Sequence, residues 1–402
     1  MKIYRVGGSI RDEILGLDKG DDDFVVVGAT EEAFLSRFPG AQRVGKAFPV
    51  YIVEGAEYAF ARRESKSAPG YRGFDTDSSP AVTLVEDLKR RDLTINAIAQ
   101  DLETRELIDP WGGRKDIAQK RLRHISDAFA EDPLRLYRVA RFAALLPDFT
   151  LEDTTLELMR RLVPELDTLS PERVWMECVR ALATRAPWRF FTVLRDVGAL
   201  AVHFPELHAL VGLTPGPDYY HEGETDTFDH AMQLLHRLPT ADPHLRFAAL
   251  CHDLGKGLTD PAILPHHYGH DAAGVELVTA LCDRLRIPNS FRLAGELAAR
   301  YHMAAAKLPV MRAGKAVTLL KKLRRFPGGG IAGYFTMIHA DSAGKAVDLT
   351  PLAPEFERIL DIPLPEKYRD LGPKSGEILL NLHAEAFKEL REKLMGDNLC
   401  PR

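Results

Sequence analysis

The stretch Gly7-Gly8-Ser9-Ile10-Arg11-Asp12, followed by Asp21-Asp22-Asp23-Phe24-Val25-Val26-Val27-Gly28, decides the fold of the first part of the chain. Residues 2–6 alternate like a short strand, and the paired glycines permit a turn and a close approach to a ligand. Apolar residues at helical spacing follow at Ile10, Ile14, Leu15 and Leu17. The glycines are therefore expected at a helix N-terminus, where free N–H groups favour a triphosphate and Arg11 can fork two phosphate oxygens.

Two aspartates, Asp21 and Asp23, stand at the start of the valine run, which is typical of a strand. Alternate residues of a strand project from the same face, so both carboxylates can hold one or two hard cations, whereas Asp22 points away. Mg²⁺ prefers such oxygen ligands and is commonly shared with substrate phosphates. An Asp-x-Asp pair alone also occurs at solvated strand ends, but together with the glycine pair and Arg11 it favours a metal site.

This ordered set resembles the head of polymerase-β-like nucleotidyltransferases, specifically that of bacterial class II CCA-adding enzymes. The resemblance implies an α+β fold, in which a head with a small mixed sheet precedes an all-helical neck and body and a helical HD domain. The expected division is a head at 1–140, a neck and body at 141–215, an HD domain at 226–345 and a helical C-terminal region at 346–402. The implied partners are tRNA, ATP and CTP, and the implied cofactor of the head is Mg²⁺, with Gly8 and Arg11 at the triphosphate.

Length and composition agree with a protein of several globular domains. A chain of 402 residues suggests two to four domains, and 45% hydrophobic with 28% charged residues is typical of soluble proteins. The net charge of −5 argues against a uniformly basic coat, so an RNA surface must be a local patch of Arg and Lys. The four cysteines, Cys178, Cys251, Cys282 and Cys400, form no Cys-x-x-Cys pair, which argues against a zinc module or a disulfide framework.

The sequence shows no recognisable targeting signal or membrane span. The N-terminus leads directly into a strand, and no run of eighteen apolar residues follows. We therefore expect a cytoplasmic protein without membrane contact, present as a monomer or a homodimer.

Further elements of the head follow from local patterns. A helix is expected after Thr30 as N-cap, and strands are expected near 49–53 and 58–61. Residues 65–79 are rich in Lys, Gly, Ser, Pro and Asp, which indicates either a mobile surface loop or a functional one. Their position resembles the family loop that helps to move the growing 3′ end.

The string Arg90-Arg91-Asp92-Leu93-Thr94-Ile95-Asn96-Ala97 matches the second motif of the family. Its apolar members are expected in the core. The resemblance implies that Arg91 touches the nucleotide and that Asp92 lies near the ribose. An arginine supplies a forked charge for the developing pyrophosphate that a lysine would lack.

Arginines recur every three residues after Glu131-Asp132-Pro133-Leu134, at Arg135, Arg138 and Arg141. One interpretation is a basic, solvated helix face with a capping Asp132. The other is base selection, because cytosine and adenine both present an amino donor beside a ring-nitrogen acceptor, which a carboxylate and a guanidinium can read. Uracil and guanine would leave the carboxylate facing a carbonyl oxygen. The string resembles the templating motif of the family, which implies Asp132 and Arg135 on the base edge and Arg138 at the nucleotide.

Residues 151–200 show helical patterns with short breaks, and a helix is expected to begin at Ser170-Pro171-Glu172. Four aromatic residues in this region are expected in the core: Trp175, Trp188, Phe190 and Phe191. No catalytic constellation is expected between 151 and 200.

A second chemical site is indicated by His230 and by His252-Asp253 in an apolar helix followed by Gly255-Lys256. This pattern resembles the HD phosphohydrolase superfamily, in which a His, a His-Asp pair and a distant Asp bind metal. Asp341 is our choice for the last ligand. Such mixed ligands suit Mn²⁺, Ni²⁺ or Co²⁺, and Mg²⁺ as well.

Four further histidines could add ligands or phosphate contacts: His266, His267, His270 and His302. Of these, His302 is expected at the surface. A basic stretch, Lys315, Lys321, Lys322, Arg324 and Arg325, is interpreted as a solvated helix face. Past Thr350 helices and Pro-rich turns are expected, without chemistry.

These patterns predict a tRNA nucleotidyltransferase that adds C, C and A and releases pyrophosphate, with an HD domain implied to be a phosphatase, 2′-nucleotidase and 2′,3′-cyclic phosphodiesterase. A third carboxylate of the head stays unassigned. Three rivals stay open: an A-adding, CC-adding or poly(A) relative, an HD phosphohydrolase with a nucleotide-sensing head, and a noncatalytic tRNA-binding protein.

Overall fold

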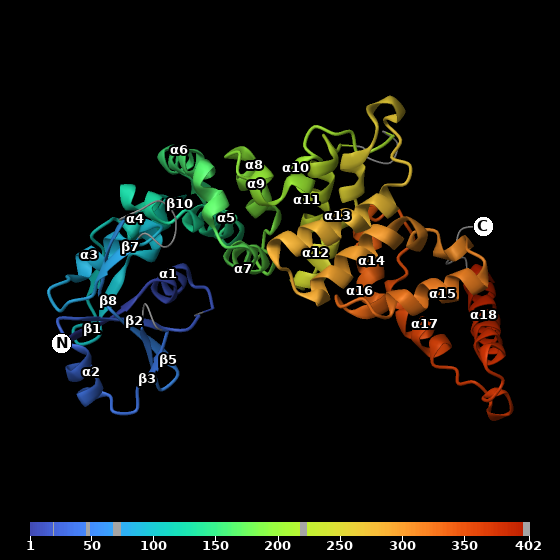
Figure 1. Ribbon diagram of the computed structural model, residues 1–402, viewed down its shortest axis with the longest axis horizontal. Helices are drawn as coiled ribbons and strands as arrows, with labels where there is room; N and C mark the ends of the chain where they lie inside the picture. Colours follow the sequence, from blue (N-terminus) through green and yellow to red (C-terminus); the bar gives the residue numbers. More distant parts are fainter. Residues whose placement is uncertain (19, 46–48, 67–73, 218–222, 397–402) are drawn as a thin grey trace. The chain divides into compact units, whose positions relative to one another are not determined.

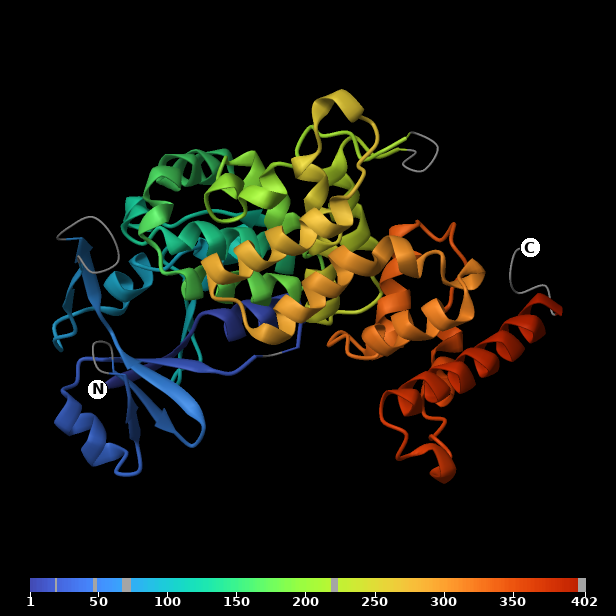
Figure 2. The ribbon, with the colours of Figure 1, turned by 45° about the vertical axis from the view of Figure 1, so that its right-hand side comes forward.

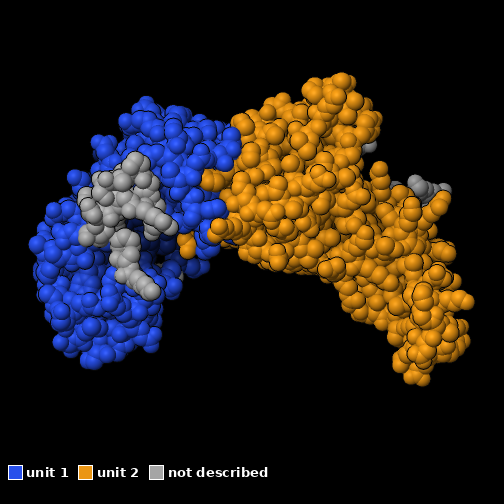
Figure 3. Space-filling model, viewed as in Figure 1, with its two compact units in different colours: residues 1–177, 193–202 blue, residues 178–192, 203–402 orange. Residues whose placement is uncertain are grey.

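The chain divides into two compact units in the computed structural model, which describes residues 1–18, 20–45, 49–66, 74–217 and 223–396 (Figures 1 and 3). The first unit contains residues 1–177 and 193–202, and the second contains 178–192 and 203–402. The helices α7 (Pro171–Leu182) and α8 (Trp188–Asp196) each contribute residues to both units.

A seven-stranded mixed sheet organises the first unit, in the order β3-β4-β5-β2-β1-β8-β9. Its strands are β1 (Lys2–Val6), β2 (Asp23–Val27), β3 (Gln42–Val44), β4 (Val50–Val53), β5 (Ala56–Phe60), β8 (Ala99–Asp101) and β9 (Leu107–Ile108). Strand β2 runs antiparallel to β1 and parallel to β5. The expected mixed sheet, and the expected strands at 2–6, 49–53 and 58–61, are thereby confirmed.

The two faces of β2 belong to two different hydrophobic clusters because alternate side chains point in opposite directions. Val25 packs with Tyr4 and Leu88 on one face. Val26 packs with Phe34 and Tyr51 on the other. With both faces covered, the strand is held in one register, and its first residue, Asp23, is held at the edge of the packed region.

The first unit also contains α-helices and short 3-10 helices. They are α1 (Gly8–Leu15), α2 (Glu31–Arg37), α3 (Leu84–Lys89), η1 (Thr94–Asn96), α4 (Gly113–Ala118), η2 (Asp127–Glu131), α5 (Leu134–Leu145), α6 (Asp153–Leu162), η3 (Val163–Thr168) and α9 (Leu200–His203). Thr30 caps α2 as expected, since its side chain accepts a hydrogen bond from the N–H of Ala33. A short parallel pair, β10 (Arg121–Leu122) with β11 (Thr150–Leu151), lies in the same unit.

Helix α1 begins at Gly8 as predicted, but the expected apolar stripe is wrong in part. Ile14 is 39% exposed, whereas Arg11 is only 4% exposed. The helix therefore turns Arg11, and not a continuous apolar row, toward the interior.

The interpretation of residues 65–79 as a loop is also wrong in part. Strands β6 (Arg63–Lys66) and β7 (Phe74–Asp77) pair antiparallel, with Arg63 opposite Asp77. Polar residues can pair in this way because backbone groups alone form the ladder. Residues 67–73, which include the expected tip of the loop, lie outside the described residues.

The second unit is helical, as expected for the HD and C-terminal regions (Figure 2). It contains α10 (Pro205–His208), α11 (Thr227–Arg237), α12 (Pro243–Cys251), η4 (Leu254–Leu258), η5 (Pro261–Ile263), α13 (His270–Leu285), α14 (Asn289–Ala305), η6 (Leu308–Val310), α15 (Ala313–Leu323), α16 (Gly330–Asp341), η7 (Thr350–Leu352), α17 (Ala353–Leu360), η8 (Glu366–Tyr368) and α18 (Pro373–Gly396). Helix α14 packs on α12, α13 and α16. The basic residues of α15 and its end are exposed, which confirms the solvated face.

The expectations about membrane-spanning helices and about the cysteines can be compared with the structure. None of the described helices is both long and apolar enough to cross a membrane. Cys178, Cys251 and Cys282 are buried free thiols, and Cys400 lies outside the described residues.

Candidate functional site

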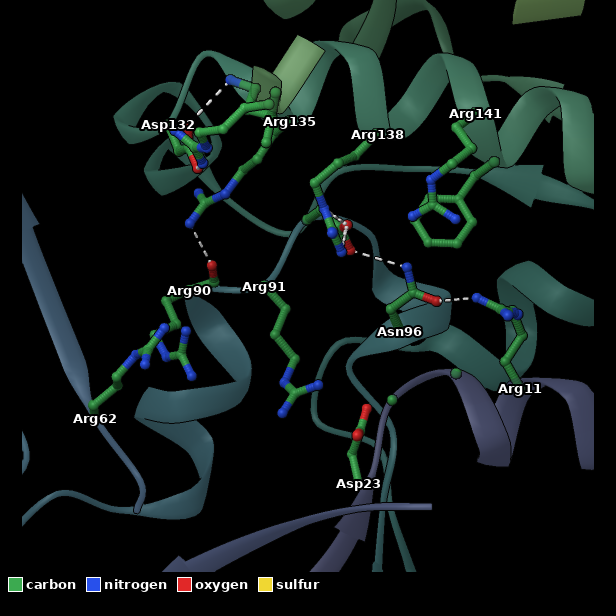
Figure 4. A pocket seen from close by; sticks show the side chains of 16 residues that line it. Arg11, Asp23, Arg62, Arg90, Arg91, Asn96, Asp132, Arg135, Arg138 and Arg141 are labelled. Carbon is green, nitrogen blue, oxygen red and sulfur yellow. Dashed lines mark hydrogen bonds and ion pairs between the residues drawn. The ribbon is translucent and has the colours of Figure 1, made fainter. Parts of the chain in front are cut away.

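A cavity of about 570 Å³ in the first unit gathers most of the predicted head residues (Figure 4). Eight arginines line it: Arg11, Arg62, Arg90, Arg91, Arg135, Arg138, Arg141 and Arg173. Three aspartates, Asp23, Asp92 and Asp132, line it as well, together with Gly7 and Gly8. The net charge of the wall is strongly positive, which suits a ligand that carries several phosphates.

Asp23 occupies the first position of β2 and lies directly opposite Glu57 of β5. Desolvation raises the pKa of Asp23, the charges of Glu57, Asp21 and Asp22 raise it further, and Arg91 lowers it. Asp21 is exposed, lies two residues before the strand and is not among the residues that line the cavity. The carboxylates that gather around Asp23 make this corner a candidate cation site, and Glu57 is a third carboxylate that the sequence analysis left unassigned.

The glycine pair makes room for an arginine. Gly7 has a φ of 83°, which L side chains rarely adopt, and a Cβ at this position would lie 3.1 Å from Nη1 of Arg91. The guanidinium of Arg91 consequently lies against the glycine turn, and in Figure 4 it points toward Asp23. Arg91 and the N-terminus of α1 therefore face the same part of the cavity.

Arg11 is in the predicted place but is already engaged. Its guanidinium donates to both carboxylate oxygens of Asp12, with distances of 2.9 and 3.0 Å, and its Nη1 donates to Oδ1 of Asn96 at 2.6 Å. It also lies over the ring of Phe142, at 5.1 Å from the ring centroid. The fork that we expected to be open to phosphate is thus held by a neighbouring carboxylate.

Buried carboxylates form ion pairs with several of the arginines that line the cavity. Asp87 is fully buried and accepts from Nη2 of Arg90 at 2.7 Å and from Nη2 of Arg91 at 3.4 Å. Asp92 is 4% exposed and accepts from Nη2 of Arg138 at 2.7 Å. These pairs fix the arginines in position before any ligand arrives, which lowers the ordering cost of binding.

Asp92 also accepts from the N–H of Leu93 at 2.8 Å and from Nδ2 of Asn96 at 2.9 Å. Burial alone would raise the pKa of Asp92, but the charge of Arg138 and these hydrogen bonds hold it well below its usual range. The carboxylate that the resemblance placed near a ribose here links Asn96 to Arg138.

Asp132 and Arg135 line the cavity, and each has a partner there. Arg135 is 6% exposed, so the alternative of a solvated basic face is wrong for it, and its Nη2 donates to the carbonyl of Arg90 at 2.6 Å. Oδ1 of Asp132 accepts from the N–H of Leu134 at 3.1 Å, and its Oδ2 accepts from Nη2 of Arg173 at 2.8 Å.

The sequence analysis missed two residues of α7. Arg173 lines the cavity, and Glu177, which is 3% exposed, accepts from Nε of Arg141 at 2.6 Å. The expectation that 151–200 carries no catalytic constellation stays a prediction, but this segment contributes Arg173 to the lining of the cavity and Glu177 as the partner of Arg141. The available signal was a charged pair four residues apart within an apolar helix run that also holds buried Trp175.

A second cluster lies in the second unit, where six side chains from different elements converge. They are His230 of α11, His252 after α12, Asp253 before η4, His270 at the start of α13, His302 of α14 and Asp341 at the end of α16. Two groups of three within this cluster are spaced for metal binding, namely His230, His252 and Asp253, and Asp253, His270 and His302.

The first group contains three of the four predicted ligands, and the fourth, Asp341, lies beside it. Nε2 of His230 lies 3.2 Å from Nε2 of His252, 2.9 Å from Oδ1 of Asp341 and 3.7 Å from Oδ2 of Asp253. Ligand atoms bonded at about 2.1 Å to one ion lie roughly 3.0 to 3.4 Å apart. The spacing of 3.2 Å falls in this range, that of 2.9 Å lies just below it and that of 3.7 Å lies just above it.

The second group shares Asp253. Nε2 of His270 lies 3.1 Å from Nε2 of His302, and each of these atoms is 3.5 Å from Oδ1 of Asp253. Oδ2 of Asp253 faces His252 instead, at 3.2 Å from its Nε2. The expectation that His302 lies at the surface is wrong, because it is 3% exposed and packed in this cluster.

All four histidines are oriented by an acceptor at Nδ1. His252, His270 and His302 face backbone carbonyls there, the shortest contacts being 2.7, 2.6 and 3.0 Å, and His230 faces Oε2 of Glu224 at 3.0 Å. A carbonyl or carboxylate only accepts, so each Nδ1 carries a proton, and a neutral imidazole in this orientation presents the lone pair of Nε2 to the centre of the cluster.

Electrostatics couple the members of the cluster. Burial alone would lower the pKa of His252, but the carboxylates of Asp253 and Asp341 raise it well above its usual value. The pKa of Asp253 is held well below its usual value, against the effect of burial, by His252 and by Lys256, whose Nζ is 2.7 Å from Oδ2. Cations thus favour the ionised carboxylate that a metal requires.

The other two candidate histidines lie outside both groups. Nδ1 of His267 is 2.7 Å from Oγ1 of Thr259, and its Nε2 is 2.9 Å from the carbonyl of Thr214. Its backbone carbonyl is the acceptor that faces Nδ1 of His270. His266 stacks on Tyr268, with ring centroids 5.4 Å apart.

Two family models match segments within residues 3–211. Residues 3–123 match the model of the poly A polymerase head domain, and residues 148–211 match that of a probable RNA and SrmB-binding site of polymerase A. The multifunctional CCA protein of Thioalkalivibrio sulfidiphilus (strain HL-EbGR7) is 50% identical over 334 residues, which span 81% of this chain and 80% of that relative. The chain belongs to the multifunctional CCA protein family. The predicted relationship to CCA-adding enzymes is thereby confirmed.

Solved members of this group share the fold. The Bacillus stearothermophilus CCA-adding enzyme in complex with CTP aligns with a TM-score of 0.65 and 24% identity, covering 98% of this chain and 93% of that one. The Thermotoga maritima CCA-adding enzyme in complex with tRNA aligns with a TM-score of 0.61 and 20% identity, covering 98% and 91%. The α+β class with a polymerase-type head, predicted from the sequence, is therefore confirmed.

Proposed function

We propose that this protein adds C, C and A to the 3′ end of tRNA, using CTP and ATP without a nucleic-acid template and releasing pyrophosphate. The observation that carries the proposal is the cavity in which Asp23 and the Gly7–Gly8 turn face eight arginines. Membership of the multifunctional CCA protein family supports it, and relatives of the same fold bind CTP and tRNA.

Asp21 and Asp23 are proposed to hold Mg²⁺, with Glu57 as the third carboxylate. The donor set fits, because three acidic groups around one strand end raise the pKa of Asp23, and a hard cation would relieve their repulsion. Mg²⁺ bound there would activate the 3′-hydroxyl and stabilise the leaving pyrophosphate.

The protein's own residues would hold the nucleotide. Gly8 and the N-terminus of α1 offer N–H groups to the triphosphate, and Arg91 lies beside them. Arg138 is held toward the same cavity by Asp92. Arg11, whose fork is held by Asp12, would contribute its charge and would keep Asn96 in place.

Base selection is proposed for Asp132 and Arg135, because a carboxylate acceptor beside a guanidinium donor suits the edges of cytosine and adenine. Arg135 would exchange the carbonyl of Arg90 for the base, whereas Asp132 would keep Arg173 at Oδ2 as its orienting partner and offer its other oxygen to the base. UTP and GTP would leave the carboxylate facing an oxygen in a desolvated site.

The test is incorporation of single nucleotides, and of CTP with ATP, into tRNA that lacks its last three nucleotides. We expect ordered addition of C, C and A by the unaltered protein, and loss of addition in Asp23→Asn but not in Asp18→Asn, which changes an exposed aspartate of the same connection. Addition of A alone, of CC alone or of long A tails would assign a sister activity. Absence of any incorporation would leave the sensing or noncatalytic alternatives.

A second activity is proposed for the second unit, namely metal-dependent hydrolysis of phosphoesters at tRNA 3′ ends, as phosphatase, 2′-nucleotidase and 2′,3′-cyclic phosphodiesterase. The convergence of four Nε2 atoms on two carboxylates supports it. The two oxygens of Asp253 face different histidine pairs, so the side chains of this cluster would be able to hold more than one ion. Mn²⁺, Ni²⁺, Co²⁺ or Mg²⁺ in this cluster would polarise a phosphate and lower the pKa of a bound water.

Metal stoichiometry and hydrolysis of a nucleoside 2′,3′-cyclic phosphate test this second proposal. We expect up to two ions per chain in the second unit, and loss of hydrolysis in His252→Ala and Asp253→Asn while CCA addition persists. His208→Ala, at an exposed histidine of α10, is the matched control. Hydrolysis that survives both site variants would contradict the assignment.

A further inference from the structure

We infer that Glu224 is a positioning residue of the metal cluster, which holds His230 in the orientation and tautomer that metal binding needs. This inference rests on the proposed phosphohydrolase function of the second unit. It concerns a residue that precedes α11 and that matched no motif in the sequence.

Glu224 differs from the acceptors of the other three histidines. Those histidines donate from Nδ1 to backbone carbonyls, which are present whatever side chains surround them. His230 donates to a side chain, Oε2 of Glu224, at 3.0 Å. The side chains of both partners are nearly buried, at 4% and 5% exposed. A buried carboxylate behind an imidazole fixes its orientation and increases the electron density of its metal-binding nitrogen.

A closed set of contacts fixes Glu224 itself. Its Oε1 lies 3.4 Å from Nη2 of Arg237, and the same Nη2 donates to Oε1 of Gln233 at 2.6 Å. Nε2 of Gln233 donates to Oδ2 of Asp229 at 2.8 Å, and this carboxylate also accepts from the N–H of Thr225, next to Glu224, at 3.1 Å. Each contact is made by α11 or by the turn before it, so helix and turn hold each other.

The turn is also anchored from outside. Asp226, the N-cap of α11, accepts from the N–H of Asp229 at 2.6 Å and from the N–H of Gly212 at 2.8 Å. The backbone that carries Glu224 is thereby tied to the segment after α10. A carboxylate placed in this way costs little ordering when metal binds, which is the property expected of a positioning group.

The charge of Glu224 matters as well as its hydrogen bond. The cluster places the carboxylates of Asp253 and Asp341 on the Nε2 side of His230, and Glu224 on the opposite side. Glutamine at position 224 could still accept from Nδ1, but it would lack the negative charge. Glu224→Gln therefore separates charge from hydrogen bonding, and Glu224→Ala removes both.

The experiment measures metal affinity in the full-length protein, which is stripped of metal and titrated with Co²⁺ while the visible absorption of the bound ion is recorded. We expect Glu224→Ala to weaken binding at the His230 position roughly ten- to a hundredfold and Glu224→Gln to weaken it less. Hydrolysis of a 2′,3′-cyclic nucleotide should fall at low Co²⁺ and recover at saturating Co²⁺, and CCA addition should not change.

Glu206 offers a matched control, because it is another buried glutamate of the second unit paired with an arginine, Arg284, and belongs to neither group of three. Glu206→Gln should leave the Co²⁺ affinity unchanged. Equal affinity in the unaltered protein and both Glu224 variants would overturn the positioning role. If the unaltered protein itself bound no Co²⁺ and hydrolysed no phosphoester, the phosphohydrolase proposal would fail instead.

Discussion

At the scale of single residues, the buried and ion-paired environment of Asp92 predicts that the charge of this carboxylate stabilises the folded protein. It is buried, it accepts from Asn96 and Arg138, and its pKa lies below the usual value. Asp92→Asn removes the charge that Arg138 faces. We expect the free energy of unfolding at pH 7 to fall by about 2 kcal/mol.

The pH dependence follows from the direction of the shift. Since the pKa of Asp92 is lower in the folded than in the unfolded protein, its contribution is complete well above about pH 4, the ordinary value of an aspartate, and is lost as the pH falls toward the lowered pKa. Urea unfolding of both proteins at pH 7, 5, 4 and 3 should show a difference that shrinks below about pH 4. Asp148→Asn, at an exposed aspartate, should show no such difference.

Arg173 makes a prediction about nucleotide choice. Its guanidinium donates to Oδ2 of Asp132 and so orients the carboxylate that we propose to read the base. Arg173→Ala removes this orienting hydrogen bond. The preference for CTP and ATP over UTP and GTP should fall about tenfold, the effect of one charged hydrogen bond. Steady-state kinetics with each nucleotide measure it, and Arg195→Ala, at an arginine paired with its own neighbour Asp196, is the control. An equal loss for all four nucleotides would instead assign Arg173 a purely supporting role.

Single residues also show where sequence reasoning stops. Gly8, Arg11, Asp23 and Arg91 could be placed together because they belong to short motifs with defined spacing. Arg173 could not, because only the packing of α7 brings it to the cavity. A charged residue within an amphipathic helix is usually solvated, and nothing local distinguishes the few that turn inward.

At the scale of elements, Gly255 controls how η4 meets α13. A Cβ at this position would lie 2.0 Å from the carbonyl oxygen of His270 and 2.6 Å from the nitrogen of Gly274. Gly255→Ala must therefore separate the two elements that carry Asp253 and His270. We expect the free energy of unfolding to fall by about 3 kcal/mol, the upper end of what overpacking a core usually costs. Metal binding should weaken as well.

Thermal unfolding and Co²⁺ titration measure both effects. Gly314→Ala in α15 is the matched control, since a Cβ there meets nothing within 4 Å and alanine is the better helix former. Normal metal affinity in Gly255→Ala would contradict the view that this contact sets the cluster.

Sequence periodicity predicted the strands and helices that bury one face. It did not predict strands that are held together by backbone hydrogen bonds alone. The strand at 2–6 and the helix after Thr30 follow from alternation and capping. The pair β6 and β7 is polar, with Arg63-Glu64-Ser65-Lys66 as one strand, so composition indicated a loop. Strand propensity describes fit to a half-buried surface, and it carries little information about a pair of polar strands.

At the scale of the whole molecule, two chemically different sites lie in two separate units. The head site is built on β2 and α1, and the histidine cluster is built by α11 to α16. Removal of metal by a chelator should therefore destabilise mainly the second unit. Metal at a hundredfold excess over its dissociation constant stabilises the state that binds it by about 2.7 kcal/mol.

Hydrogen exchange with and without Co²⁺ checks this expectation. Amides of α11, α12, α13 and α14 should exchange faster in the stripped protein, whereas those of β1 and β2 should be unchanged. Faster exchange in both units would show that the metal stabilises the molecule as a whole.

The packing of helices against one another was the feature least predictable from the sequence. The four expected ligands of the cluster come from a known pattern. His270 and His302 are two of the four histidines that could add ligands, and only the packing of α13 on α14 distinguishes them from His266 and His267. A contact between helices depends on many weak apolar interactions, and these leave no motif around either histidine.

The arginine-lined cavity has a consequence for the protein between catalytic cycles. Eight guanidinium groups around about 570 Å³, with three aspartates among them, will attract small anions from solution whenever no nucleotide is bound. Sulfate, inorganic phosphate and the pyrophosphate product would then compete with CTP and ATP for one place. The rate of the enzyme in a cell would depend on how quickly its own product is hydrolysed by other proteins.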